Sequence, residues 1–240
     1  MLRIARLNTL PSEAQPHLSF PSMIDLTPWN LTLPIETPAL TVATAALPNL
    51  QTSYFTNTGD KVVFWAPVTG SHSGTSDYPR SELRETSADG KARNWLYNSG
   101  QNTLKGTLSV NQVPSTGRVV VAQIHAKNAA APLLKVVYRY ANGTGNIDLE
   151  YRVNPSDVKS PVAYTVPNVP LNKAFAYAIQ MNKQGKLTVL INNAGPQIQL
   201  APSWYGYAFY FKAGVYTLDN VGYATEGGKV TYTRLEVSHL

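Results

Sequence analysis

The chain contains no cysteine, and this absence excludes several kinds of chemistry. Without thiols there is no disulfide framework, no thiolate zinc site and no cysteine nucleophile, and thiol chemistry gives no indication of the redox compartment. The sequence also lacks an apolar run approaching the roughly 18 to 20 residues that a membrane-spanning helix requires. We therefore expect a soluble protein.

Charge is also scarce, because only 14% of the residues are charged. The 20 Lys and Arg residues exceed the 14 Asp and Glu residues, which gives a formal net charge of +6. A modest basic excess suits a polyanionic partner without identifying it. From composition alone, nucleic acid, an anionic polysaccharide and a membrane surface all remain open.

Several common catalytic motifs are missing as well. The sequence has no His-x-His, HExxH or clustered Asp motif, so we expect no catalytic metal, and nothing in it suggests a cofactor. Walker A, GxGxxG and GxSxG motifs are also absent, which argues against nucleotide hydrolysis, dinucleotide binding and α/β-hydrolase chemistry.

Short runs of alternating, β-branched and aromatic residues recur between clusters of Gly, Pro, Asn and Asp, whereas helical periodicity is weak. This pattern predicts strands over residues 61–66, 80–86, 103–110, 118–125, 133–140, 146–153, 175–181, 186–192, 207–216 and 229–239. Such spacing is typical of a two-sheet sandwich, of which the jelly roll is one form. The predicted fold class is an all-β antiparallel sandwich.

The length of 240 residues suits a single domain. Residues 1–22 are weakly patterned and predict a peripheral lead-in that lacks the unbroken apolar core of a secretory signal. Residues 23–240 then form the single predicted domain, because no composition break or internal repeat marks a second one. The loop from Pro67 to Tyr78 is long for a hairpin, and such loops are often functional.

Three of the predicted strands carry a chemically unusual face. Residues two apart on a strand share a face. The three faces consist of Arg80, Glu82 and Arg84; of Val121, Gln123 and His125; and of Tyr210, Lys212, Gly214 and Tyr216.

Each of these faces alone could be an ordinary solvated surface. If the three strands share a sheet, they line a concave surface that suits an extended anionic ligand. Lys135 and Arg139 share a face of a fourth strand and are candidates to extend this basic groove, although they could equally be solvated. Gly214 lies within a strand, which indicates that something approaches the backbone closely there.

At these residues the sequence resembles the alginate lyases of polysaccharide lyase family 7. That family has strand motifs of the forms R(S/T)EL-R, Q(I/V)H and YFKAG-Y, which match RSELR at 80–84, QIH at 123–125 and YFKAGVY at 210–216. The motifs occur in order, and the resemblance extends from about Met23 to the C-terminus. It implies a jelly roll whose concave sheet binds alginate, a polymer of mannuronate and guluronate, and cleaves it by β-elimination.

The resemblance also implies roles for individual residues. By motif position, the catalytic residues are Arg80, Gln123, His125 and Tyr216, and the substrate-binding residues around them are Glu82, Arg84, Tyr210 and Lys212, to which we add Lys135. The QIH form of the second motif is associated with guluronate-containing substrate. The expected preference is therefore for polyguluronate or mixed blocks.

The chemistry of β-elimination explains why these residue types are needed. Removal of the C5 proton builds charge beside a carboxylate, which Arg80 and Gln123 are expected to neutralise. His125 is the expected base and Tyr216 the expected acid for guluronate, whereas Tyr216 is expected to serve both roles for mannuronate. Nearby Arg and Lys are expected to favour tyrosinate. Glu82 is expected to stay ionised and to orient the two arginines beside it.

Two other functions remain open from the sequence. A non-catalytic carbohydrate-binding module would share the jelly roll, although pure binding needs no acid and base. A lyase for another polyuronate, such as glucuronan, would use the same chemistry. We expect an anionic polysaccharide partner, no membrane partner, a monomer, and no nucleic acid, because no basic helix is present. The family's substrate implies a secreted or periplasmic protein, although no clear signal peptide is visible.

Overall fold

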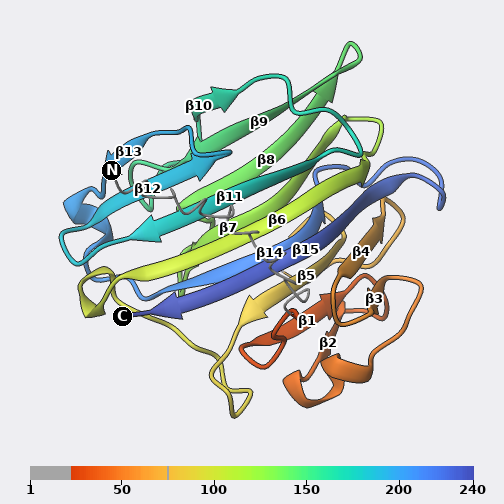
Figure 1. Ribbon diagram of the computed structural model, residues 1–240, viewed down its shortest axis with the longest axis horizontal. Helices are drawn as coiled ribbons and strands as arrows, with labels where there is room; N and C mark the ends of the chain where they lie inside the picture. The colour runs from red at the N-terminus through yellow and green to blue at the C-terminus, as the bar shows by residue number, and fades with distance from the viewer. Residues whose placement is uncertain (1–22, 75) are drawn as a thin grey trace, which may run out of the picture.

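The computed structural model describes residues 23–74 and 76–240, which form two antiparallel β-sheets (Figure 1). The eight-stranded sheet contains, in spatial order, β10 (Val162–Val166), β9 (Thr144–Tyr151), β8 (Leu134–Ala141), β7 (Arg118–Ala126), β14 (Phe209–Thr217), β5 (Arg80–Glu85), β1 (Trp29–Leu33) and β2 (Leu40–Val42). The seven-stranded sheet contains β13 (Gln197–Gln199), β12 (Lys186–Ile191), β11 (Ala174–Met181), β6 (Asn102–Gln112), β15 (Gly227–His239), β4 (Val62–Pro67) and β3 (Phe55–Asn57). Short 3-10 helices lie at η1 (Thr44–Asn49), η2 (Tyr97–Ser99) and η3 (Pro202–Trp204).

The predicted all-β antiparallel sandwich is confirmed, and every predicted strand is present with ends that shift by at most two residues. The predicted lead-in over residues 1–22 lies outside the described residues. Strands β1, β2, β3, β10 and β13 were not predicted. They are three to five residues long and lie at or next to the sheet edges, where a run is too short to show a period.

The apolar faces of both sheets meet in one hydrophobic core. On β14, the side chains of Phe209, Phe211, Ala213 and Val215 alternate with the polar set and are fully buried. From the opposite sheet, Phe64 and Tyr232 meet edge to face with ring centroids 5.6 Å apart. Burying one large apolar side chain stabilises a fold by about 1.5 to 3 kcal/mol, so this face holds β14 firmly in place.

The predicted face of β7 is wrong at one residue, Val121. The register between β7 and β14 shifts so that Val120 pairs with Tyr216 and Ala122 pairs with Ala213, and the pairing with β8 shifts at the same place. This bulge reverses the alternation locally, so Val121 belongs to the hydrophobic core.

Gly214 is required by the close approach of β5. Its φ of +141° is one that other residues rarely adopt, and an added Cβ would lie 2.5 Å from the carbonyl oxygen of Ser81 and 2.9 Å from the Cα of Glu82. The neighbouring strand, rather than a ligand, therefore explains this glycine.

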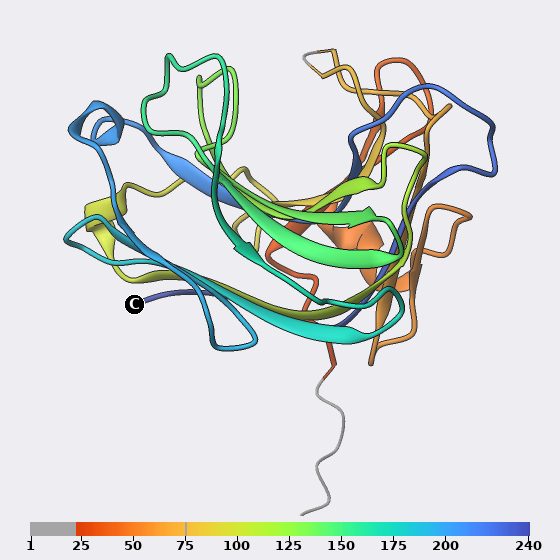
Figure 2. The ribbon, with the colours of Figure 1, turned by 90° about the horizontal axis from the view of Figure 1, so that it is seen from above.

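The eight-stranded sheet is curved, with long loops rising on both sides of its hollow face (Figure 2). The predicted concave sheet is thus present. In the part of the chain that the structure describes, no helix is long and apolar enough to cross a membrane.

Candidate active site

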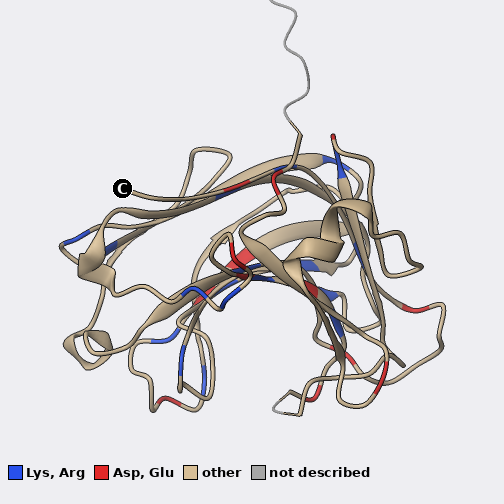
Figure 3. Ribbon diagram, turned by 90° about the horizontal axis from the view of Figure 1, so that it is seen from below, with Lys and Arg blue, Asp and Glu red and all other residues tan. Residues whose placement is uncertain are grey.

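The hollow face of the eight-stranded sheet holds a groove with a cavity volume of about 760 Å³. In Figure 3, basic and acidic positions lie close together along the arch of this sheet. The predicted site residues that line the groove are Arg80, Gln123, His125, Lys135, Tyr210, Lys212 and Tyr216. A hollow of similar volume, about 770 Å³, lies on the other sheet around Trp65 and Lys229, but its lining has no carboxylate and no histidine. Chemistry rather than size therefore marks the first groove as the candidate site.

Strand register brings the three predicted faces together. Strand β14 lies between β5 and β7. Lys212 pairs with Gln123 on one side and Arg84 on the other, while Tyr216 pairs with Arg80 and Tyr210 pairs with His125. Paired residues on antiparallel strands share a face, so the side chains of all three motifs lie on one surface.

Glu82 is the centre of the ion pairs and is only 1% exposed. Its Oε2 atom lies 2.5 Å from Lys212 Nζ and 3.2 Å from Arg80 Nη1, and its Oε1 atom accepts a hydrogen bond from Gln123 Nε2. Burial alone would raise the pKa of Glu82, but the charges of Lys212 and Arg80 together with the hydrogen bonds outweigh burial and lower it. Glu82 is therefore ionised but has a low affinity for a proton, and both of its oxygens are already bound, so it is a poor candidate for the base.

Lys212 is buried almost as deeply, with 8% of its surface exposed. Burial lowers the pKa of Lys212 to about 8, and the charge of Glu82 opposes this shift. The ammonium group is therefore still charged at neutral pH, but it loses its proton more readily than a lysine on the surface does.

Ser76 bridges Arg80 and Tyr216. Arg80 Nη2 donates to Ser76 Oγ at 2.5 Å, and the same oxygen lies 3.0 Å from the hydroxyl of Tyr216. The guanidinium carbon of Arg80 also lies 4.0 Å from the centroid of the Tyr216 ring, which is a cation–π contact. Ser76 was not among the predicted site residues, although it lies in the long loop from Pro67 to Tyr78.

The expectation that Tyr216 is favoured as tyrosinate is wrong. Burial raises the pKa of Tyr216 above its ordinary value, and the hydrogen bond with Ser76 and the charge of Arg80 oppose this only in part. At neutral pH the phenol is therefore protonated and can donate its proton.

His125 stacks on Tyr210, with ring centroids 5.3 Å apart and an angle of 18° between the planes. Its Nδ1 atom lies 2.9 Å from the backbone nitrogen and 3.0 Å from the carbonyl oxygen of Ala126, which leaves Nε2 for the groove. Burial, helped by the charge of Lys212, lowers the pKa of His125 to about 4. The imidazole is therefore neutral at pH 7 and able to accept a proton.

Arg84 is not held by Glu82, contrary to the prediction, and it does not line the groove. Its guanidinium donates to the carbonyl oxygen of Glu85, to that of Arg93 at 3.0 Å and to Asn94 Oδ1 at 2.7 Å. The guanidinium carbon lies 4.1 Å from the centroid of the Tyr210 ring. Arg84 thus supports Tyr210, and through it the imidazole of His125.

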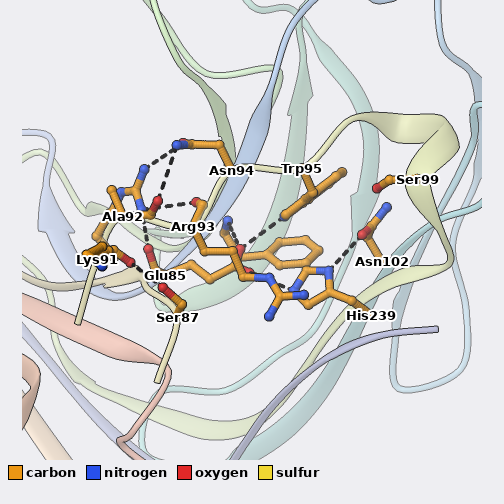
Figure 4. A network of polar contacts seen from close by, with 12 residues as sticks. Glu85, Ser87, Lys91, Ala92, Arg93, Asn94, Trp95, Ser99, Asn102 and His239 are labelled. Carbon is orange, nitrogen blue, oxygen red and sulfur yellow. Dashed lines mark hydrogen bonds and ion pairs between the residues drawn. The ribbon is translucent and has the colours of Figure 1, made fainter. Parts of the chain in front are cut away.

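A second polar network fixes the segment that binds Arg84 (Figure 4). The fully buried carboxylate of Glu85 accepts hydrogen bonds from Trp95 Nε1 at 3.0 Å and from the backbone nitrogen of Phe211 at 2.9 Å. Its other oxygen lies 2.6 Å from His239 Nε2, and His239 Nδ1 lies 2.7 Å from Asn102 Oδ1. This network joins β5, β14 and the last residues of β15.

The basic side chains of β8 are paired with acids of β9. Lys135 Nζ lies 2.6 Å from Glu150 Oε2, and Arg139 Nε lies 2.6 Å from Asp148 Oδ2. Lys135 lines the groove, but Arg139 does not, so of the two possibilities left open for Arg139 the extension of the groove does not hold. Arg152, which was not a predicted site residue, lines the groove instead.

The described part of the chain contains no group of three or more His, Cys, Asp or Glu side chains that could hold a metal ion. What the groove offers is an imidazole, phenols, an amide, cations and the carboxylate of Asp77. Such a set can neutralise an anion, accept a proton and donate one.

Comparison with known proteins assigns the family. Residues 24–239 match the family model described as alginate lyase. An alginate lyase from Klebsiella pneumoniae is 27% identical over 277 aligned positions, which cover 90% of this chain and 89% of that protein.

Solved structures agree with this match. The structure of an alginate lyase from Pseudomonas aeruginosa is 41% identical, with a TM-score of 0.87 and coverage of 90% of this chain and 100% of that one. The structure of alginate lyase A1-II', a member of polysaccharide lyase family 7, is 30% identical, with a TM-score of 0.79 and coverage of 90% and 96%. The family model spans almost all of the described residues and both structures meet or exceed 30% identity, so this chain belongs to the alginate lyases of polysaccharide lyase family 7.

Proposed function

We propose that this alginate lyase cleaves guluronate-containing blocks by β-elimination, with Arg80, Gln123, His125 and Tyr216 as its catalytic residues. The observation that carries the proposal is the chemistry of one groove, which contains a neutral imidazole, a protonated phenol and a guanidinium with an amide beside it. β-Elimination from a uronate needs a base, an acid and a neutralised carboxylate.

The substrate carboxylate is the first requirement, because removal of the adjacent C5 proton adds negative charge to it. Arg80 and Gln123 both contact Glu82, which fixes where their remaining donors point. In our proposal these donors bind the carboxylate and stabilise the enolate-like intermediate. Side chains held on strands keep this geometry better than side chains on a loop.

Proton transfer is the second requirement. His125 Nε2 takes the C5 proton, and the electron pair of the C5–H bond forms the double bond between C4 and C5. The bond from C4 to the glycosidic oxygen breaks, and that oxygen takes the proton of Tyr216. The lowered pKa of His125 and the raised pKa of Tyr216 support these roles, because each group starts in the required protonation state. The double role expected of Tyr216 for mannuronate lacks this support, because a protonated phenol cannot accept the C5 proton.

Two observations support the guluronate preference. The QIH sequence at Gln123–His125 matches the motif form associated with guluronate-containing substrate. A Tyr→Phe variant of A1-II', 30% identical to this chain, was solved with product (GGG), and a His→Asn, Tyr→Phe variant was solved with substrate (GGMG), where G is guluronate and M is mannuronate.

The test follows the ultraviolet absorbance of the new double bond during incubation with alginate. Tyr216→Phe and Arg80→Ala should each lower turnover at least a hundredfold, roughly the contribution of a general acid or of one transition-state donor. Tyr164→Phe, on the edge strand β10, is the matched control and should keep normal turnover. Near-normal activity of either groove variant, with folding unchanged by circular dichroism, would refute the assignment.

A panel of polyguluronate, polymannuronate and glucuronan tests the substrate. The proposal expects the highest kcat/KM on polyguluronate or on mixed blocks. Faster cleavage of polymannuronate would overturn the preference, and cleavage of glucuronan alone would move the activity to another polyuronate. Binding of alginate without new unsaturated ends would favour a carbohydrate-binding module.

A further inference from the structure

The groove contains a buried cation that no acidic side chain balances within residues 23–74 and 76–240. The Lys and Arg residues in its lining are Arg80, Lys135, Arg152 and Lys212. Arg80 and Lys212 share Glu82, and Lys135 pairs with Glu150. Arg152 makes no ion pair in this part of the chain and is only 6% exposed.

The surroundings of Arg152 do little to offset this charge. Its Nε atom donates to the carbonyl oxygen of Pro132 at 3.3 Å, which leaves the terminal nitrogens for another partner. The same end of the groove is lined by Ala129, Ala130, Ala131 and Val158. An arginine is always ionised in proteins, and burying a charge without a partner is costly. A buried guanidinium at a groove wall therefore indicates an anion that is bound from outside.

We propose that Arg152 binds the carboxylate of a uronate residue away from the bond that is cleaved. This inference rests on the proposed function, because it takes the ligand to be a polyuronate. Every sugar of such a chain carries a carboxylate, so a chain that places one carboxylate at Arg80 also places others along the groove. The planar fork of a guanidinium suits a carboxylate, which can accept two parallel hydrogen bonds.

The strand order gives the position of this subsite. Arg152 follows β9, and β8 separates β9 from β7, the strand that carries His125. Neighbouring strands lie about 4.8 Å apart, so Arg152 is roughly 10 Å to one side of the strand that supplies the base. A short oligomer bound across the reaction centre does not reach this far, whereas a longer chain does.

The experiment measures kcat/KM on saturated alginate oligomers of increasing length for the wild type, Arg152→Gln and Arg152→Lys. Removal of a hydrogen bond to a charged group typically lowers affinity about ten- to hundredfold. Arg152→Gln should therefore lose about this factor on long oligomers and keep near-normal kcat/KM on the shortest oligomer that is cleaved. Arg152→Lys should keep most of the activity on long oligomers, because it keeps the charge. The matched control is Arg139→Gln, which lies outside the groove and should change neither.

Two outcomes would overturn the subsite. One is an unchanged kcat/KM of Arg152→Gln on long oligomers. The other is an equal loss on all lengths in both Arg152 variants, which would mean that Arg152 only supports the loop at Pro132. Calorimetric titration of the same oligomers into Tyr216→Phe, with and without Arg152→Gln, requires no cleavage. It therefore tests Arg152 even if the wild type releases no unsaturated product and the proposed reaction fails.

Discussion

The neutral state of His125 makes the folded protein sensitive to acid in a way that can be measured. The pKa of His125 falls from an ordinary value of 6.5 to about 4 on folding, chiefly because the ring is buried. Between these two values the unfolded chain binds a proton that the folded chain does not. The contribution of the neutral His125 to the unfolding free energy is therefore fully present above pH 6.5. It is lost as the pH falls from 6.5 towards 4.

The size of the effect follows from the shift. One pKa unit corresponds to about 1.4 kcal/mol, so the full difference between the two limits is roughly 3 kcal/mol. At about pH 4.5 most of this loss, roughly 2 to 3 kcal/mol, has already occurred. A variant without the imidazole, His125→Asn, lacks this contribution and should be less sensitive to acid by the same amount.

Urea unfolding of wild type and variant at about pH 7.5 and pH 4.5 checks this difference. Other groups titrate in both proteins and cancel when the wild-type change is compared with the variant change. His72→Asn, at an exposed loop position, is the matched substitution control. If wild type and His125→Asn lose the same unfolding free energy between the two pH values, the buried neutral imidazole is refuted.

Further predictions concern the charges and the backbone around the groove. Glu82→Gln leaves two buried cations without a counter-charge and should lower the unfolding free energy by about 3 to 5 kcal/mol. Adding Lys212→Met should recover part of this lost free energy. Strictly additive losses of the two substitutions in urea unfolding would contradict the shared ion pair. Lys212→Ala should raise KM for alginate, with a loss that shrinks as salt is added, whereas a change in kcat alone would oppose a binding role. Gly214→Ala should cost roughly 2 to 5 kcal/mol, because its Cβ would clash with β5, and a neutral result would show that the strand can shift. His239→Ala removes the 2.6 Å contact to the buried Glu85 and leaves that oxygen with only Arg93 Nε, 3.5 Å away, so it should lower the unfolding free energy by roughly 1 to 3 kcal/mol; an unchanged denaturation midpoint would show that the network is dispensable.

Much of the fold could be predicted from the sequence because the long strands carry a clear period. Residues 209–216 show this well, since their aromatic and polar sets alternate without interruption. The short strands at or next to the sheet edges could not be predicted, because three to five residues are too few to establish a period. The bulge at Val121 could not be predicted either, since it depends on how two neighbouring strands pair.

The candidate site was predictable as a set of residues but not as a set of contacts. The alternation of side chains along a strand placed Arg80, Glu82 and Arg84 on one face. It could not show that Glu82 binds Lys212 while Arg84 binds a separate loop. The protonation of Tyr216 was mispredicted, because nearby charges are visible in a sequence and the extent of burial is not. Arg152 was not predicted for a related reason, since only the folded chain shows that no acidic side chain among the described residues pairs with it.

The placement of Glu82 and Glu150 behind the groove has a consequence for turnover. A row of fully uncompensated cations would hold the polyanion and its fragments tightly, and tight binding that does not change in the transition state does not speed the chemical step. Each of these acids offsets basic side chains that line the groove. The cleaved fragments carry the same carboxylates as the substrate, so this partial compensation favours their departure and allows the next chain to enter.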